Sequence, residues 1–466
     1  MNLSLSTRVL SRCIGALMCI TLVAACGDDD PETPTVPRTT QKVNSFVMAY
    51  AKDAYLWNHK VPTDIDISRE ADPFTLMDRV VYSEYDRWSY LTDDADALFK
   101  DYEGISTTYG YRLTVYKFSN AESYFAVVRF VYPGSPAEQA GLERGDILLT
   151  MNGTDINAEN YMNLYYSPNV TLKTGTVTET GIVPGSKTVA MQAVEMYLDP
   201  VNTYRTIDCE GKRVGYLCYT DYVEASHPKL LAIFQDFKNR GVSDVVLDLR
   251  YNPGGAAKSA RFLASILAPA NAVAAGDVLL KEEWNDKYTE YYKARGEDLT
   301  EYFNKTIGVN MNLDRLFVLT GSGTASASEA TMVGLMPYMD VVQVGETTHG
   351  KYCGALLIRP WTDNEGTLDP EIDNWAMSLV VYKFANKNGF TDFKDGLAPA
   401  HPIADDWTSA YPLGDERDPM LAKVLEIVGG KPASRTDHTQ QSPVLPGKPL
   451  PDTMQPDYRR GGMTKK

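Results

Sequence analysis

The sequence predicts a multidomain protein of mixed α/β and α+β class, and three changes of pattern along its 466 residues predict it. Apolar and aromatic residues recur at helical spacing over residues 43–103, which predicts a small helical N-terminal module. Residues 104–196 change to short alternating strands separated by turns. From 197 to 430, strand-like and helix-like runs follow one another, which is typical of an α/β sheet. A chain of this length should hold two or three domains with sizeable cores.

The first 25 residues have the pattern of a secretory signal peptide. Arg8 and Arg12 supply a positive start, and a mostly apolar run follows from Cys13 to Val23. This run is too short to cross a bilayer as a stop-transfer helix. It ends in Leu22-Val-Ala-Ala-Cys26, which resembles a bacterial lipobox. The resemblance implies that Cys26 becomes the first residue of the mature protein and carries a lipid.

The segment that begins at Cys26 is predicted to connect the lipid anchor to the folded protein. Residues 26–42 are rich in Pro and Thr and are predicted to form a tether. Asp28, Asp29 and Asp30 resemble the acidic tract of some Bacteroidetes lipoproteins at the cell surface, although a plain solvated linker is the alternative. We therefore expect a secreted lipoprotein anchored in a membrane through Cys26, in the outer membrane, on its periplasmic or its cell-surface face.

Two other segments have their own composition. The stretch from about 276 to 310 is polar and rich in Tyr, Glu and Lys, which predicts an inserted surface segment. The last residues, 431–466, contain many Pro, Gly, Ser and Gln and few apolar groups. This composition predicts a disordered tail, because it offers too little apolar surface to offset the entropy of ordering.

Charge and rare residues limit the possible partners. Loss of the first 25 residues, which hold two arginines and no acidic residue, takes the net charge from −16 to −18. This sign argues against nucleic acid or an anionic membrane surface as the main partner. Five histidines without ligand spacing imply no metal, and no cofactor is expected. Cys209 and Cys218 flank a predicted hairpin turn; a disulfide between them and two free thiols both remain open.

The string from Tyr132 to Gly153 closely resembles the PDZ signature. A strand ends, a short helix starts after a proline, and a second strand closes on Asn152-Gly153, a strong hairpin signal. PDZ domains bind a peptide as an added strand and hold its terminal carboxylate with backbone amides. The resemblance places this loop near Tyr109, Gly110 and Tyr111. A PDZ domain that serves only as a structural lid is the alternative.

A serine and a lysine carry the candidate chemistry. Ser326 lies in Gly321–Glu329, directly after a strand-like apolar run, and is predicted to open a helix. Lys351 follows a second such run and lies on a loop flanked by glycine. A serine hydroxyl is a weak nucleophile until a base takes its proton, and a lysine can be that base if burial lowers its pKa. This pair predicts a serine–lysine hydrolase.

Three segments, together with the PDZ string, resemble the carboxyl-terminal processing peptidases, also called tail-specific proteases. They are Leu247–Gly255, Thr324–Glu329 and Gly345–Lys351. The resemblance covers about residues 43–410 in order. It implies a PDZ domain beside an α/β protease core of the ClpP/crotonase-like type, with Ser326 as nucleophile and Lys351 as general base.

Other residues of these segments have predicted roles. The amide of Ala327, at a helix N-terminus, is expected to face the developing oxyanion. The second donor is expected from Gly254 and Gly255, where backbone can approach the scissile carbonyl closely. The family usually has a glutamine four residues after the lysine, where it orients the amine. This sequence has Ala355 there, and we expect His349 to be a structural replacement for an aromatic residue and Cys353 not to act as a nucleophile.

Together these observations predict a lipid-anchored serine endopeptidase that cleaves envelope or extracellular proteins or peptides, with a C-terminal tail as a candidate substrate feature. Two alternatives remain. The first is a catalytically decayed lipoprotein that binds peptides or other ligands on the same scaffold, marked by the missing glutamine. The second is a hydrolase of small esters or envelope components.

Overall fold

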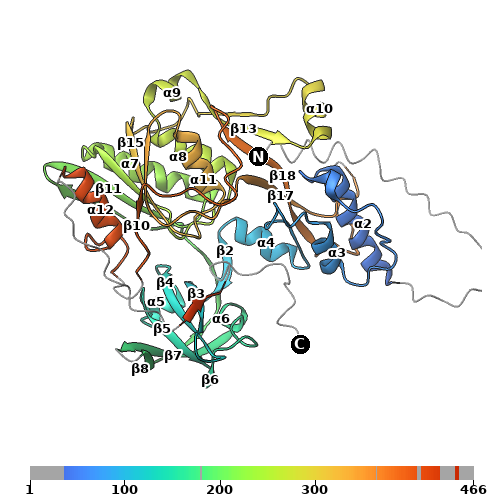
Figure 1. Ribbon diagram of the computed structural model, residues 1–466, viewed down its shortest axis with the longest axis horizontal. Helices are drawn as coiled ribbons and strands as arrows, with labels where there is room; N and C mark the ends of the chain where they lie inside the picture. The colour runs from blue at the N-terminus through green and yellow to red at the C-terminus, as the bar shows by residue number, and fades with distance from the viewer. Residues whose placement is uncertain (1–35, 179–180, 364, 407–410, 431–446, 451–466) are drawn as a thin grey trace, which may run out of the picture.

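The computed structural model describes residues 36–178, 181–363, 365–406, 411–430 and 447–450, and all structural statements concern these residues. Figure 1 shows an α/β body that carries the N-terminal helices α2 and α3 at one end and a β-rich domain below it. Cys26 and the predicted signal peptide lie outside the described residues. Within the described part of the chain, no helix has the length and apolar character needed to cross a membrane.

A six-stranded sheet forms the centre of the α/β body, in the order β10-β11-β12-β15-β16-β19. Its strands are β10 (Val201–Cys209), β11 (Lys212–Tyr219), β12 (Asp244–Asp248), β15 (Arg315–Thr320), β16 (Asp340–Gly345) and β19 (His401–Pro402). β10 pairs antiparallel with β11, and the other pairs are parallel. The carboxyl ends of β12, β15 and β16 therefore meet at one edge, where ligands commonly bind in such sheets. All three segments singled out in the sequence lie at this edge.

Helices bury both faces of this sheet, which explains the continuous apolar runs of β12 and β15. Val245 and Leu247 share a core with the helices of one face, and Val246 packs with helix α12 on the other. The helices of the first face are α7 (His227–Asn239), α8 (Ala257–Leu267) and α11 (Ala327–Leu335), and α12 spans Pro419–Val428. The short helices η2 (Glu224–Ser226) and α9 (Ala270–Ala275) lie in the connections.

The N-terminal module is built into the α/β body. Its elements are α2 (Arg38–Asp53), η1 (Asn58–Lys60), α3 (Pro73–Val80), β1 (Tyr90–Thr92) and α4 (Ala95–Tyr102). Strand β1 pairs with β18 (Ala376–Asn386), and Val47 and Leu76 belong to the same buried cluster as Leu247. Helix α2 begins at Arg38, within the stretch assigned to the tether. The module is helical as predicted, but its core is shared with the body, so it is not a separate folding unit.

A second sheet contains the segment predicted to be a surface insertion, and that prediction is wrong in part. The sheet has the order β1-β18-β13-β14, with β17 paired to β18. Its further strands are β13 (Val278–Trp284), β14 (Thr300–Tyr302) and β17 (Cys353–Ile358), and α10 (Asp286–Ala294) follows β13. Trp284, Tyr288 and Tyr292 are buried. These three aromatic side chains therefore build core, while Lys281 and Glu283 of β13 are exposed.

The β-rich domain is a seven-stranded sheet with the path β20-β3-β4-β5-β7-β8, and β6 pairs with β5. Its elements are β3 (Tyr111–Phe118), β4 (Tyr124–Val131), α5 (Pro136–Gln139), β5 (Ile147–Met151), β6 (Thr154–Asp155), α6 (Asn163–Tyr166), β7 (Asn169–Thr178), β8 (Gly181–Gln192) and β20 (Gly447–Pro449). Asn152 and Gly153 have φ of 53° and 83°, which confirms the predicted hairpin. A two-stranded sheet of β2 (Ile105–Thr108) and β9 (Val194–Tyr197) joins the entry and exit of this domain.

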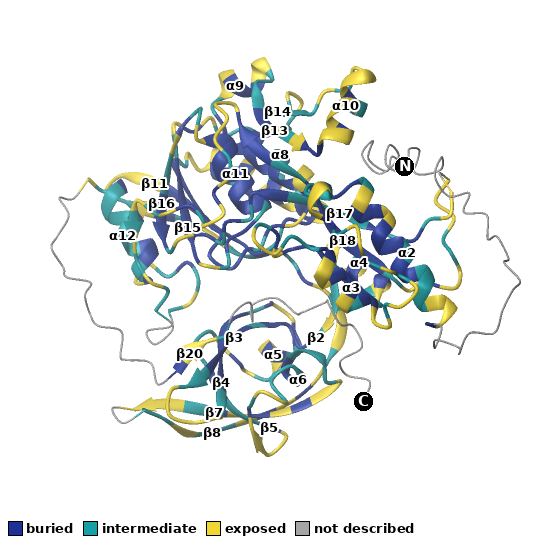
Figure 2. Cartoon of the chain, turned by 45° about the vertical axis from the view of Figure 1, so that its right-hand side comes forward, coloured by how far each residue is buried: buried dark blue, intermediate teal, exposed yellow. Residues whose placement is uncertain are grey.

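The predicted disorder of the last residues is wrong for one short segment. Residues 447–449 form β20, which pairs with β3 of the β-rich domain. Figure 2 shows β20 beside β3, far from α12, the helix that precedes it in the chain. The rest of the predicted tail lies outside the described residues. A pairing partner more than 300 positions away leaves no trace in local composition, so the prediction could not include it.

The two cysteines of the predicted hairpin are free thiols. They flank the β10–β11 turn as expected, but they do not face each other. Cys209 lies opposite Lys212, and Cys218 lies opposite Thr203. The register of the hairpin therefore excludes the disulfide that the sequence left open.

Candidate active site

Ser326 is held in an unusual backbone conformation at the start of α11. It has φ 56° and ψ −113°, a region that residues other than glycine rarely adopt. The chain leaves the end of β15, turns sharply and enters the helix, so that Ser326 lies at the helix N-terminus and is partly exposed. Strained positions of this kind cost of the order of 1–3 kcal/mol and cluster at functional sites. The geometry therefore favours Ser326 over its neighbours as a nucleophile.

The neighbouring serines are placed differently. Ser322 is exposed, and its amide donates to the Glu346 carboxylate. Ser328 is fully buried, and its hydroxyl donates to the Asn252 carbonyl oxygen at 3.1 Å. Neither hydroxyl stands at the start of the helix beside the predicted oxyanion donors.

Lys351 lies in the loop between β16 and β17, beside the same edge of the sheet. Burial lowers the pKa of its ammonium group from 10.5, although the Cys353 thiol, Asp86 and Glu329 act in the opposite direction. This direction is the one that a lysine base requires. Among the described residues, no hydrogen bond joins Lys351 Nζ to Ser326 Oγ. Catalytic hydrogen bonds are often longer in unliganded enzymes and tighten when substrate binds.

Glu329 holds the serine and the lysine segments together. Its side chain is fully buried, and one carboxylate oxygen accepts from the Ser326 amide at 2.9 Å and from the Lys351 amide at 2.8 Å. The other oxygen accepts from the Thr348 hydroxyl at 2.6 Å and from the Gly350 amide at 2.7 Å. Burial raises the pKa of Glu329, and these four donors oppose that shift. A single carboxylate therefore fixes the backbone of the candidate nucleophile and of the candidate base.

The glycine pair lies directly against Ser326. A Cβ added to Gly254 would lie 2.7 Å from Ser326 Cβ and 2.9 Å from the Ala327 amide nitrogen. The Gly254 amide donates to Asn252 Oδ1, and its carbonyl accepts from the Tyr222 amide. In the described part of the chain, the amides of Gly255 and Ala327 have no acceptor. Gly254 thus supplies space, and the free donors are those of Gly255 and Ala327.

Asn252 and Tyr222 shape this loop, and the sequence predicts no role for either residue. Asn252 is fully buried, and its side chain donates to the Tyr219 carbonyl oxygen and accepts from the Gly254 amide. The Tyr222 backbone forms a bridge with Gly255. Asn252 lies within the segment Leu247–Gly255. Ser326-x-x-Glu329 has the spacing of a capping box, which is the sequence signal that could have identified Glu329. For Tyr222, whose backbone acts, no sequence signal exists.

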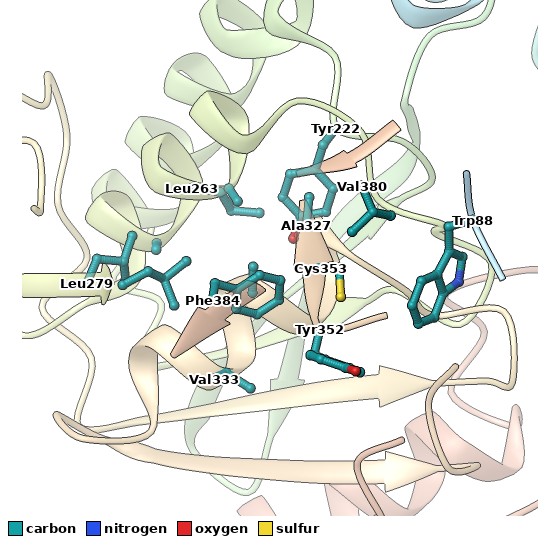
Figure 3. Close-up of a cluster of buried hydrophobic side chains, with 14 of the residues drawn as sticks. Trp88, Tyr222, Leu263, Leu279, Ala327, Val333, Tyr352, Cys353, Val380 and Phe384 are labelled. Carbon is teal, nitrogen blue, oxygen red and sulfur yellow. The ribbon is translucent and has the colours of Figure 1, made fainter. Parts of the chain in front are cut away.

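The residues around Lys351 are packed into the core, as Figure 3 shows for Cys353, Tyr352 and Trp88. Cys353 is fully buried, and burial raises the pKa of its thiol, which keeps it protonated. The His349 ring lies edge-on to Trp88, with centroids 6.2 Å apart. Ala355 lies on β17 opposite Val380 and packs against the buried cluster. Its methyl group cannot orient an amine.

The predicted carboxylate loop of the β-rich domain lies at the start of β3. Tyr109 and Tyr111 are buried, and their hydroxyls donate to the Ser167 and Leu164 carbonyl oxygens at or near α6. The Gly110 amide donates to Thr108 Oγ1, and a Cβ on Gly110 would collide with Ser135. The two tyrosine side chains therefore hold α6 in place, and they are not available to a peptide. A role of this loop in substrate binding stays a prediction.

Metal chemistry has no obvious support in the described residues, where no group of three or more His, Cys, Asp or Glu is placed to hold an ion. The candidate site consists of a serine, a lysine, a buried glutamate and backbone amides. This set suits nucleophilic acyl transfer.

Comparison with known proteins agrees with this arrangement. The model of peptidase family S41 matches residues 213–401, that of the peptidase S41 N-terminal domain matches 42–90, and a PDZ model matches 127–164. An S41 protease structure from Bacteroides fragilis superposes with a TM-score of 0.69 at 28% identity, over 87% of this chain and 99% of that one. The predicted order of N-terminal module, PDZ domain and protease core is confirmed.

Curated relatives give the same result. A carboxyl-terminal-processing protease from Picosynechococcus sp. is 28% identical over 308 residues, which cover 64% of this chain and 65% of that protein. Carboxy-terminal processing protease CtpB from Bacillus subtilis is 23% identical over 413 residues, which cover 83% of this chain and 74% of that protein. Other relatives are covered less, such as 42% of a chloroplastic peptidase from Arabidopsis thaliana.

Proposed function

We propose that this chain, which belongs to peptidase family S41, is a serine endopeptidase of the tail-specific type that cleaves proteins or peptides near their C-termini. Ser326 Oγ attacks the scissile carbonyl carbon while Lys351 Nζ accepts its proton. The oxyanion receives hydrogen bonds from the amides of Ala327 and Gly255. Lys351 then protonates the leaving amine, and water hydrolyses the acyl-enzyme.

The observation that supports this proposal best is that the Glu329 carboxylate accepts hydrogen bonds from both the Ser326 and the Lys351 amides. It brings a strained serine, a lysine of lowered pKa and two free amides to one edge of the sheet. Each oxyanion donor of this kind is worth about 3–4 kcal/mol in the transition state. A protein that only bound peptides would have no use for a serine in a strained conformation beside unused amides.

The direct test is labelling of the protein with a fluorophosphonate probe, followed by mass spectrometry of the adduct. We expect a covalent adduct on Ser326 that is lost in Ser326→Ala and reduced at least a hundredfold in rate in Lys351→Ala. Ser322→Ala, which changes an exposed neighbouring serine, serves as the matched control and should label like the parent protein. Labelling that persists in folded Ser326→Ala protein would reject the mechanism.

A second candidate function is ligand binding by a catalytically decayed relative. One observation favours it: Ala355 stands where the family has its orienting glutamine, and Lys351 Nζ has no hydrogen-bond partner among the described residues. In this case the folded protein would bind a peptide but form no adduct, and Ala355→Gln would restore labelling. An adduct on Ser326 that forms as fast in the parent protein as in Ala355→Gln would exclude decay.

We further propose that the protein is a lipoprotein anchored through Cys26. The lipobox-like Leu22–Cys26 and the run of aspartates after it support this proposal. Metabolic labelling with an alkyne fatty acid should tag the parent protein and not Cys26→Ser, and the latter should leave the membrane fraction. Membrane association that is unchanged in Cys26→Ser would contradict the anchor.

A further inference from the structure

The edge of the PDZ sheet that faces α6 is occupied by the chain itself. Strand β20 pairs antiparallel with β3, with Gly447 opposite Phe118 and Pro449 opposite Tyr116. The Leu450 amide continues the ladder by donating to the Val115 carbonyl oxygen at 2.8 Å. This is the arrangement of a peptide that joins a sheet as an added strand.

The orientation of β20 fits a ligand of this groove. From Gly447 to Leu450 the chain runs along β3 towards Gly110, the loop predicted to receive a terminal carboxylate. Leu450 is half-buried and packs against the cluster that contains Leu164 of α6 and Val115. The strand therefore inserts one apolar side chain on the α6 side of β3, while Lys448 faces solvent.

Gly447 makes the close approach possible. It is buried, and a Cβ at this position would lie 2.4 Å from the Lys117 carbonyl oxygen and 2.8 Å from the Phe125 ring. Any larger residue would push β20 away from β3. The sequence of the tail is thus matched to the groove at Gly447 and at Leu450.

In the described residues, backbone pairing and one apolar side chain hold β20 on β3. Among the described residues, no side-chain hydrogen bond or ion pair involves residues 447–450, and both Lys448 and Pro449 are exposed. On the α6 side of the groove, the Tyr165 hydroxyl donates to the Leu113 carbonyl oxygen of β3. Backbone pairing with one apolar side chain in the groove is the way a sheet edge holds a peptide ligand.

We infer that β20 is a peptide ligand carried by the chain, which occupies the groove between β3 and α6 and must be displaced by an incoming C-terminal peptide. Because β20 belongs to the same chain as β3, its pairing is intramolecular, and a free peptide must compete with a tethered strand. A free peptide is therefore kept out of the groove until its concentration divided by its Kd exceeds the effective concentration of β20 divided by the Kd of β20. Only the identity of the competitor as a substrate tail rests on the proposed function.

Peptide binding to the full-length protein tests the inference. The parent carries Ser326→Ala to prevent cleavage, and the probe is a fluorescein-labelled synthetic peptide of residues 444–454. We expect Gly447→Val and Leu450→Asp, each in this background, to bind the probe with a Kd at least tenfold lower than the parent. Lys448→Ala, which changes an exposed side chain of the same strand, is the matched control and should bind like the parent.

Hydrogen exchange provides a second readout on the parent protein. The Leu450 amide should be protected, and excess probe should remove this protection. An identical Kd for all four proteins, or an unprotected Leu450 amide, would overturn the inference. The two proposals fail separately. If Gly447→Val and Leu450→Asp bind the probe more tightly, but the protein with native Ser326 forms no acyl-enzyme, the peptidase proposal is rejected and this inference stands.

Discussion

Glu329 has the most demanding environment of any residue at the candidate site. It is a fully buried carboxylate, and four donors point at its two oxygens. A buried charge is tolerated only when such donors compensate for lost hydration. The same donors belong to the segments of the candidate nucleophile and the candidate base, so the compensation and the placement of Ser326 and Lys351 are one structural feature.

Glu329→Gln should separate placement from chemistry. An amide group keeps the size of the side chain but turns one acceptor into a donor, which then faces amide or hydroxyl donors. We expect kcat to fall by 10- to 100-fold with little change in KM, and Tm to fall by several degrees, because a buried donor is left unpaired. Peptide cleavage kinetics and thermal unfolding measure both. Glu103→Gln, on an exposed side chain, is the control and should behave like the parent. A kcat of Glu329→Gln within twofold of the parent would contradict the placing role of Glu329.

The lowered pKa of Lys351 predicts a specific pH dependence. A general base must be neutral, so kcat/KM should rise with pH and level off above the pKa of the lysine, at a pH below 10.5. Lys351→Arg, which stays charged, should lose at least a hundredfold in kcat/KM over the whole range. A pH–rate profile from pH 6 to 11 measures the ascending limb. The same profile should be measured for the residual activity of Lys351→Ala. If kcat/KM of this variant rises with the same midpoint, the rise belongs to another group and not to Lys351.

The same shift has a consequence for stability. The unfolded chain binds the lysine proton more tightly than the native protein, so stability rises as pH increases from the lowered native pKa towards 10.5. At neutral pH the lowered pKa therefore makes the fold less stable than a lysine of ordinary pKa would. Lys351→Met, which removes the titrating group, should raise the Tm. Thermal unfolding at pH 7 tests this; a lower Tm for a correctly folded variant would show that the ammonium group stabilises the site.

At the scale of elements, the site depends on how three strand ends meet. β12, β15 and β16 are parallel neighbours, and the loop after each supplies a different part: the glycine pair, the serine and the lysine. Gly254 lies where two of these loops touch, with φ of 110°. A side chain there is excluded both by the backbone conformation and by Ser326 itself.

Gly254→Ala should therefore damage catalysis more than stability. The added methyl group would lie 2.7 Å from Ser326 Cβ and 2.9 Å from the Ala327 amide, and something must move. We expect kcat to fall by at least 100-fold, the size of effect seen when an oxyanion donor is lost. Gly241→Ala, also at positive φ but with open space around it, is the matched control for backbone strain. Equal loss of activity in both variants would show that the effect is general strain.

Strands whose pattern is local could be predicted from the sequence, and strands defined by distant partners could not. The apolar runs before Ser326 and Lys351 identified β15 and β16, and Asn152-Gly153 identified the β5–β6 hairpin. In contrast, β13 is polar in sequence because one of its faces carries Lys281 and Glu283, and its place in a sheet depends on pairing with β18. Glu329 was visible in its motif, but its role required knowing which amides surround it.

At the scale of the whole molecule, a buried group of charges joins the PDZ domain to the protease core. Asp405 of the core contacts Arg129 and Arg144 of the PDZ domain and Arg250 beside β12. These side chains are 10% exposed or less. Tyr251 follows Arg250, stacks on Phe130 of β4 and leads directly into the loop of Gly254. The position of the PDZ domain is thus linked through packed residues to the loop that contains Gly254.

Asp405→Asn should weaken this junction strongly. Three buried guanidinium groups would lose their shared carboxylate, and removing one partner of a buried ionic group costs about 3–5 kcal/mol. The arginines lower the pKa of Asp405, so its contribution is present above the unfolded pKa of 3.8 and disappears as pH falls towards the native pKa. The difference in unfolding free energy between parent and variant should therefore be large at pH 7 and shrink below pH 3.8. Chemical denaturation across this range measures this difference.

Asp395→Asn, whose carboxylate is 87% exposed in its ion pair with Lys394, is the control and should change stability by less than about 1 kcal/mol. A loss at Asp405 no larger than in this control would show that the junction is held by the stacking of Tyr251 and Phe130.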